Sequence, residues 1–109
     1  MVKVVYYDLE TTNLRPLTGP RGVEIVQIGA VCKQTRNKTQ NKFNMYLVPD
    51  QDISPGATRI NGLTRDDLVE DFDSGRFNNV VEPQEGLQEF MNFLDNQRDY
   101  DDEGILLVS

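Results

Sequence analysis

The sequence predicts an α/β fold in which three antiparallel strands precede a helix and a fourth strand that runs parallel to the first. The first observation is a set of four short apolar runs with the composition of strands, at residues 2–7, 24–32, 42–48 and 105–108. The second is an amphipathic stretch at residues 83–96, between the third and fourth runs. A parallel crossover requires a connection of this size, so the last strand is expected beside the first.

The first half of the chain reads as an antiparallel meander. Val2–Tyr7 is β-branched and aromatic, which is typical of a buried strand, and the run stops at Asp8. Glu24–Cys32 is a second run of the same kind, and a loop rich in proline and glycine separates it from the first. Lys42–Val48 alternates apolar and polar side chains with a period of two, and Pro49 ends it.

The segment after the third strand carries weaker signals. Residues 57–60 are compatible with one short helical turn. Thr64 has the character of a helix N-cap, because Asp66 and Asp67 follow it in the first turn. Residues 70–79 are acidic and polar, and they read as a loop. One helical turn and a capped helix start are therefore expected between the third strand and the long helix, followed by a loop.

Regular structure resumes with a helix at Pro83–Asn96. Proline suits the first turn of a helix, because the N–H that it lacks would have no partner there. Apolar side chains recur at i, i+3, i+4 and i+7 and predict a stripe that faces the core: Leu87, Phe90, Met91 and Leu94. Ile105–Val108 follows as the fourth strand. Because Ser109 comes directly after this buried strand, we expect residues 1–109 to be the N-terminal part of one longer domain.

The composition excludes several classes of protein. The 109 residues are 38% hydrophobic and 27% charged, which indicates a single globular unit. No apolar run approaches the ~20 residues of a membrane span, and the N-terminus turns polar too early for a secretory signal. Cys32 is the single cysteine, so we expect no internal disulfide and a reducing, intracellular location. Histidine is absent, which excludes a His-based triad or a His-ligated metal within these residues.

Charge is divided unevenly along the chain. The net charge is -7, but residues 1–49 carry +4 and residues 50–109 carry -11. Acidic surfaces bind nucleic acid poorly, because phosphate affinity comes from Lys and Arg. The basic first half is therefore the part that could face a phosphate backbone, while simple solvation of both halves remains the alternative interpretation.

Asp8 and Glu10 are the residues most suggestive of chemistry. They lie two apart at the end of the first strand, so a period of two places both carboxylates on one face. Two ionised acids held side by side repel each other, and a hard divalent cation such as Mg²⁺ relieves that repulsion. Such carboxylates can hold metal ions for phosphodiester cleavage. An ordinary acidic end of a strand is the alternative.

Four segments resemble the DEDD, or DnaQ-like, family of 3′–5′ exonucleases. Residues 7–14, Tyr-Asp-Leu-Glu-Thr-Thr-Asn-Leu, resemble the first exonuclease motif, F-D-x-E-T-T-G-L. Residues 24–31 are similar to the second strand of the family, and the stretch from Pro49 to Thr64 is similar to its P-x-x-x-I…hGIT segment. Residues 104–109 resemble the strand that leads into the second motif. The resemblance covers almost the whole chain in the order of the family.

This resemblance implies a partial ribonuclease H-like fold and a metal-dependent 3′–5′ exonuclease. The implied reaction hydrolyses terminal phosphodiesters of DNA or RNA to nucleoside 5′-monophosphates. Two Mg²⁺ ions are the implied cofactors, and Mn²⁺ would substitute for them. The implied partner is a single-stranded nucleic-acid 3′ end, with no membrane partner. The sequence indicates neither the oligomeric state nor the choice between DNA and RNA.

The same resemblance assigns roles to five residues. It implies that Asp8 bridges both metal ions and that Glu10 binds the ion that activates water. Thr11 and Thr12 would line the pocket for the terminal nucleotide, partly through backbone N–H groups. Leu14 would pack against the terminal base.

The resemblance is incomplete at its C-terminal end. The second-motif Asp, the general base and the last Asp of the family have no counterparts among these residues, so we expect residues 1–109 alone to be inactive. A non-enzymatic interpretation, an inactive ribonuclease H-like scaffold or interaction domain, is the alternative. The -11 charge of residues 50–109 motivates it, because that charge does not favour a nucleic-acid partner.

Overall fold

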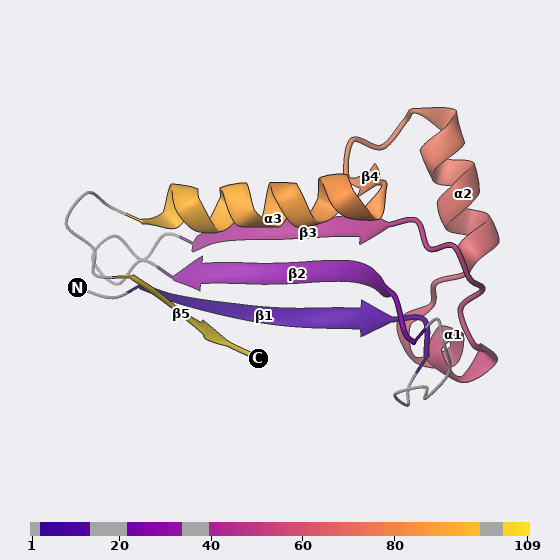
Figure 1. Cartoon of the computed structure of the whole chain (residues 1–109), viewed down its shortest axis with the longest axis horizontal. Coiled ribbons are helices and arrows are strands. Elements are labelled where there is room, and N and C mark those ends of the chain that lie inside the picture. The colour runs from indigo at the N-terminus through magenta and orange to yellow at the C-terminus, as the bar shows by residue number, and fades with distance from the viewer. Residues whose placement is uncertain (1–2, 14–21, 34–39, 99–103) are drawn as a thin grey trace.

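A five-stranded sheet forms the centre of the molecule, with strand order β4-β3-β2-β1-β5 (Figure 1). The computed structural model describes residues 3–13, 22–33, 40–98 and 104–109. In chain order the elements are β1 (Lys3–Thr11), β2 (Ile25–Lys33), β3 (Gln40–Leu47), α1 (Pro55–Asn61), α2 (Arg65–Ser74), β4 (Val80–Val81), α3 (Pro83–Gln97) and β5 (Ile105–Val108). No helix in these ranges is long and apolar enough to cross a membrane.

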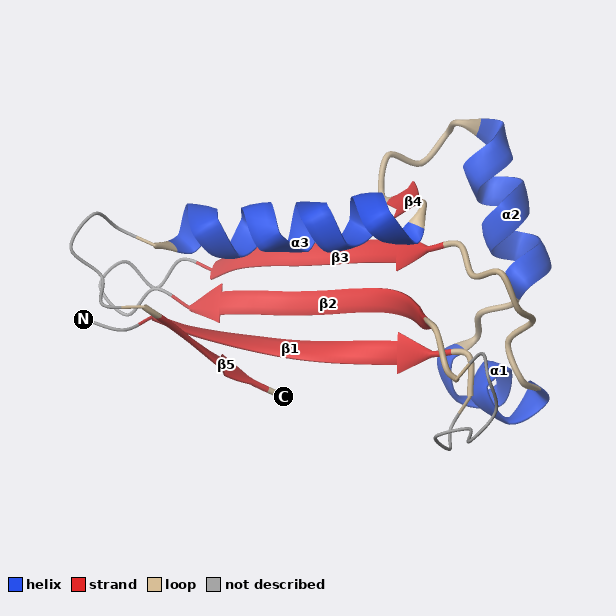
Figure 2. Ribbon diagram, viewed as in Figure 1, coloured by secondary structure: helices blue, strands red, loops and turns tan. Residues whose placement is uncertain are grey.

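The strand pairing confirms the predicted topology. β1, β2 and β3 form an antiparallel meander, and β5 pairs with β1 in parallel from Lys3 opposite Ile105 (Figure 2). α3 makes the crossover between the two halves, as the length of the connection required. β4 was not predicted, because a two-residue strand leaves no period in the sequence; it pairs in parallel with the end of β3.

Two boundaries differ from the expectation. β1 continues through Asp8 to Thr11, because the backbone goes on pairing with β2 after the apolar residues end. α2 extends to Ser74, through residues predicted to be a loop. Its N-cap is Thr64, as predicted, and it ends at Gly75 in the left-handed conformation (φ 68°). The helix was not predicted over its full length because most of its residues are charged and Leu68 is its buried residue.

The core-facing side of α3 also differs from the predicted stripe. Leu87 and Met91 are 48% and 55% exposed, so they do not face the core. The buried side carries Phe90 and Leu94 as predicted, together with Phe93. The helix is therefore rotated about its own axis relative to the orientation that the apolar pattern suggested.

Gly86 explains this rotation. It is buried, and a Cβ built on it would lie 2.7 Å from Cγ of Leu47 on β3. α3 thus approaches the sheet most closely where it has no side chain. At the other end of the helix, the side chain of buried Gln97 accepts a hydrogen bond from Nδ2 of Asn41 at 2.8 Å.

Two apolar clusters hold the sheet and the helices together. Val5, Ala30 and Cys32 form the first cluster, beneath the aromatic side chains of α3 and Phe43. The ring centroid of Phe43 lies 5.5 Å from the ring centroid of Phe90 and 5.3 Å from that of Phe93. The second cluster joins α1 and α2 to the start of β2. It contains Val26, Ile53, Ala57 and Leu68. Cys32 is buried in the first cluster.

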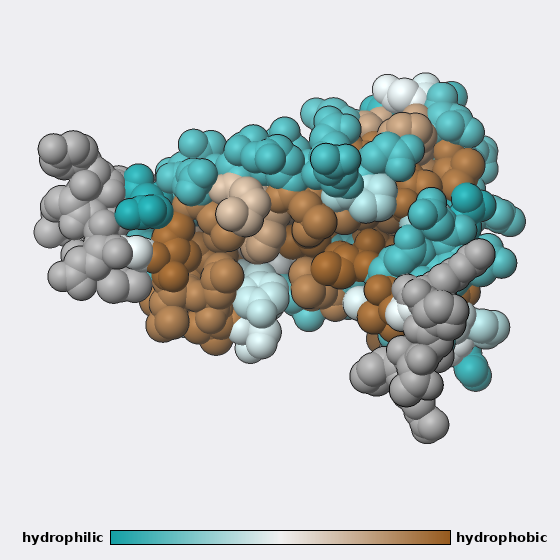
Figure 3. Space-filling model, viewed as in Figure 1, coloured by the Kyte–Doolittle hydropathy of each residue, from teal (hydrophilic) through white to brown (hydrophobic). Residues whose placement is uncertain are grey.

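Apolar surface remains outside these clusters. Figure 3 shows it gathered below α3, over β1 and β5. Leu106 and Leu107 of β5 are 55% and 46% exposed, and as neighbours in a strand they lie on opposite faces.

Replacement of Gly86 by alanine tests the close packing of α3. Alanine favours a helix by about 1 kcal/mol over glycine, but here its Cβ would clash with buried Leu47. We expect Gly86→Ala to lower the free energy of unfolding by about 1–3 kcal/mol in urea denaturation. In a Leu47→Ala background the clash is absent, and Gly86→Ala should be neutral or stabilising. A loss of stability in both backgrounds would contradict this explanation.

Candidate metal and nucleotide site

Asp8 and Glu10 lie within β1, on the face of the sheet that α3 does not cover. Val5 and Tyr7 pack in the cluster beneath α3, so the alternate residues of the strand point to the opposite face. Asp8 pairs with Gly29 and Glu10 with Gln27 of β2. Asp8 is exposed and Glu10 is partly buried. The strand therefore places both carboxylates side by side, as the spacing predicted, although inside the strand rather than at its end.

Both carboxylates are available for a ligand. Within the described ranges neither accepts a hydrogen bond or forms an ion pair, which leaves their oxygens to water or to a cation. Carboxylate oxygens of this kind suit Mg²⁺ and Mn²⁺. The described residues bring together no group of three or more His, Cys, Asp or Glu. The donor set in the described part of the chain is thus a pair of acids.

Thr12, two residues after Glu10, joins three segments of the chain. Its backbone N–H donates to the carbonyl of Glu24 at 2.9 Å, and its carbonyl accepts from the N–H of Ser54 at 2.8 Å. Its hydroxyl accepts from the N–H of Glu24 at 3.1 Å. The residue is 2% exposed. The expected use of its N–H by a nucleotide conflicts with these contacts, which make Thr12 part of the support of the site.

Glu24 fastens the loop that follows β3. Its two carboxylate oxygens accept the backbone N–H groups of Asp50 and Gln51, at 3.1 and 3.0 Å. The side chain of Gln51 donates to the carbonyl of Gly22 at 3.1 Å. A carboxylate that receives two backbone N–H groups forms stronger hydrogen bonds than a neutral acceptor does. Glu24 therefore ties this loop to the start of β2, next to Thr12.

α1 is positioned by the same network. Ser54 donates its N–H to Thr12 and caps α1 by accepting the N–H of Ala57 on its hydroxyl. The helix ends at Gly62, whose left-handed conformation (φ 74°) permits the reversal into α2. The end of β1 and the start of α1 are thus held together by backbone contacts.

Two other predicted site residues have different outcomes. The hydroxyl of Thr11 donates to the carbonyl of Asn13 at 2.7 Å, which fixes the turn as the chain leaves β1. Leu14 lies outside the described residues.

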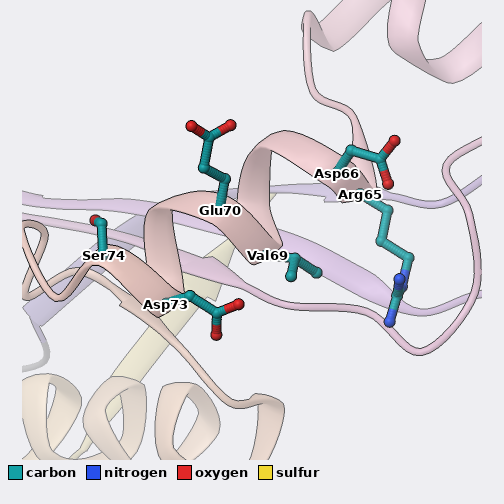
Figure 4. A pocket seen from close by; sticks show the side chains of 6 residues that line it. All are labelled: Arg65, Asp66, Val69, Glu70, Asp73 and Ser74. Atoms are coloured by element: carbon teal, nitrogen blue, oxygen red, sulfur yellow. The ribbon is translucent and has the colours of Figure 1, made fainter.

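A separate hollow of about 620 Å³ runs along α2 and is distinct from this site (Figure 4). Asp66, Glu70 and Asp73 line it, but Glu70 and Asp73 project from different sides of the helix in that view. Arg65, at its edge, donates through Nε to the carbonyl of Pro49 at 2.9 Å. Its acids do not converge, so it is no candidate for a metal centre.

Comparison with known proteins shows which family the chain belongs to. A family model described as "Exonuclease" matches residues 5–103. The chain belongs to the DEDD, or DnaQ-like, exonuclease family. The match includes β1 with its two acids, the Glu24 network and α3. The predicted membership and the partial ribonuclease H-like fold are confirmed.

Two curated proteins illustrate the similarity of sequence. The DNA polymerase III subunit epsilon of Pasteurella multocida (strain Pm70) is 30% identical over 91 residues, covering 83% of this chain and 32% of that protein. The subunit of the same name from Escherichia coli (strain K12) is 31% identical over 71 residues, covering 64% of this chain and 29% of that protein. The chain thus spans about a third of the length of these relatives.

A solved structure shows the same fold. The chain described as "crystal structure of full-length 3'-exonuclease" superimposes with a TM-score of 0.61 over 87% of this chain and 29% of its own length. The sequence identity is 16%, so this likeness concerns the fold.

Sequence reasoning found the two acids but missed the residues that support them. Glu24 and Ser54 hold the surroundings of Thr12 through contacts between distant segments. One signal for Glu24 was present, because residues 1–49 contain three acidic residues and the other two are Asp8 and Glu10. An isolated acid at the start of a buried strand indicates a specific partner.

Replacement of Glu24 by alanine tests the support network. The change removes the acceptor of two backbone N–H groups, so we expect the free energy of unfolding to fall by about 1–3 kcal/mol. Urea denaturation of the full-length protein measures this. Glu89→Ala removes the same charge from an exposed position of α3 and should change stability by less than about 0.5 kcal/mol. Equal effects of the two variants would contradict the assigned role of Glu24.

Proposed function

We propose that residues 1–109 form the N-terminal part of a domain that hydrolyses nucleic acid from the 3′ end and releases nucleoside 5′-monophosphates. The observation that carries the proposal is the pair Asp8 and Glu10, adjacent on one strand face and without partners among the described residues. Family membership supports the reaction class. Residues of the protein outside this chain would complete the centre.

The role proposed for Asp8 and Glu10 is to hold divalent metal, Mg²⁺ or Mn²⁺, as the resemblance implied. Bound metal of this kind supplies Lewis acidity and makes a water molecule acidic enough to serve as a nucleophile at neutral pH. β1 pairs with β2 at Asp8 and Glu10, and it pairs with β5 just before them, from Lys3 to Tyr6. The backbone that carries the two carboxylates is therefore held in the sheet. A preorganised position of this kind reduces the cost of orienting the reacting groups.

The nucleotide end of the site is proposed to lie where the chain leaves β1. Thr11 and Leu14 remain the predicted contacts of the terminal nucleotide. Thr12 is proposed to position them, because its own polar groups are bonded to Glu24 and Ser54. The relatives are named as DNA polymerase subunits, which makes single-stranded DNA the first substrate to test.

Replacement of Asp8 by asparagine tests the proposed function. The change keeps the shape of the side chain but removes the charge that would hold the metal. We expect the rate of cleavage of a 5′-labelled single-stranded oligonucleotide, in the presence of Mn²⁺, to fall by about 100-fold or more. The thermal unfolding midpoint should stay the same or rise, because a like-charge repulsion is relieved.

Asp66→Asn is the matched control, since it removes an exposed carboxylate from α2, far along the chain from β1. It should leave the cleavage rate unchanged. Cleavage by the Asp8→Asn variant at the wild-type rate would refute the role proposed for Asp8. A full-length wild-type protein that cleaves neither DNA nor RNA would refute the function.

A further inference from the structure

A hollow on the open face of the sheet adjoins Asp8 and has no role in the function proposed so far. Its volume is about 400 Å³. Its floor is Gly29 of β2, which lies between Asp8 of β1 and Asn44 of β3 in the strand register. Tyr6 and Lys42 stand at one end of it. The hollow is therefore continuous with the proposed metal site.

Gly29 creates the hollow, although no contact among the described residues requires a glycine there. Its φ is not positive, and a Cβ would meet a single atom, the backbone oxygen of Asp8, at the ordinary distance of 3.9 Å. Glycine inside a strand weakens the strand, and it commonly marks a place where a ligand approaches the backbone. Gly29 thus leaves room for a ligand to approach the backbone beside Asp8.

The side chains at the end of the hollow suit a nucleic-acid strand. Val31 of β2 pairs with Tyr6 of β1 on one side and with Lys42 of β3 on the other, so the three residues form one row across the sheet. Nζ of Lys33 stands 5.7 Å from the centre of the Tyr6 ring, and that ring is 48% exposed. Tyr6 precedes Asp8 by two residues, which is about 7 Å along a strand. On this face of the sheet, Tyr6 and Lys42 therefore lie one row away from Asp8, and Lys33 lies in the row beyond them.

The exposed sides of α2 and α3 would repel phosphate. The exposed sides of α2 and α3 carry carboxylates: Asp66, Asp67, Glu70, Asp73, Glu85 and Glu89. Arg65, in the first turn of α2, is already bonded to the carbonyl of Pro49. The open face beside Asp8 thus offers Lys33 and Lys42 to a polyanion, whereas the exposed sides of α2 and α3 are mainly acidic.

We propose that this hollow carries the nucleic-acid strand upstream of the nucleotide that is cleaved. The strand would pass over Gly29, place a base against Tyr6 and bring phosphates to Lys33 and Lys42. Aromatic stacking and a cationic groove are the usual means of holding a single strand without reading its sequence. The inference rests on the proposed function and adds to it a path for the substrate.

Substrate length separates this path from the metal site. The full-length protein should be assayed on an octathymidylate and on the p-nitrophenyl ester of thymidine 5′-monophosphate, which has no upstream strand. For Tyr6→Ala and for Lys42→Ala we expect KM on the octanucleotide to rise roughly tenfold. The rise in KM on the ester should be several-fold smaller. For Lys42→Ala the slope of log affinity against log salt should decrease by about 0.7.

Filling the hollow is a second test that removes no charge. Gly29→Val adds a β-branched side chain that the strand accommodates, so the thermal unfolding midpoint should be unchanged or higher. KM on the octanucleotide should again rise about tenfold, since the strand could no longer lie over position 29. Arg76→Ala, which removes one positive charge between α2 and β4, is the matched control and should leave KM and the salt slope unchanged.

The outcomes separate the two proposals. A wild-type protein that cleaves neither substrate refutes the proposed function and removes the basis of the path. Wild-type cleavage of both, with the Tyr6, Gly29 and Lys42 variants affecting both equally or neither, overturns the path and leaves the function intact. A change in self-association alone, seen by size-exclusion chromatography, would assign this face to a second copy of the chain and also overturn the path.

Discussion

Repulsion between two carboxylates on one strand face is the constraint on which the proposed site depends. Asp8 and Glu10 lie where the pairing of β1 with β2 fixes them, and no described residue neutralises either one. Like charges held together in this way cost stability unless a cation or a proton joins them. A fold that keeps Asp8 exposed, with the partly buried Glu10 beside it, is therefore suited to take up a divalent cation at neutral pH.

The surroundings of this pair are organised to resist movement. The backbone of Thr12 bonds to β2 and to the start of α1, and Glu24 holds the loop after β3. These contacts join three segments that are distant in sequence at the point where β1 ends. The open face beside the pair, by contrast, is hollow at Gly29 and cationic at Lys33 and Lys42. Rigid support on one side and an accessible surface on the other are what binding the end of a polymer requires.

Local patterns in the sequence predicted the strands, their pairing and the two acids, because each has a period or a spacing of its own. The sequence did not reveal features that depend on contacts between distant segments. β1 reaches Thr11 because β2 is available to pair with it, and α3 turns Leu87 outward because Gly86 lets the helix approach Leu47. The bonds of Thr12 to Glu24 and Ser54 likewise follow from tertiary structure alone. Leu14 lies outside the described residues, so its contact with the terminal base stays a prediction.

A calorimetric titration of Mn²⁺ into the full-length protein tests the central claim most directly, because it needs neither substrate nor turnover. We expect saturable binding in the wild type, with affinity weakened by at least about tenfold in Asp8→Asn and in Glu10→Gln. Asp66→Asn should bind as the wild type does. Absence of binding in the wild type, or unchanged affinity in both site variants, would contradict the assignment of these two acids as metal ligands.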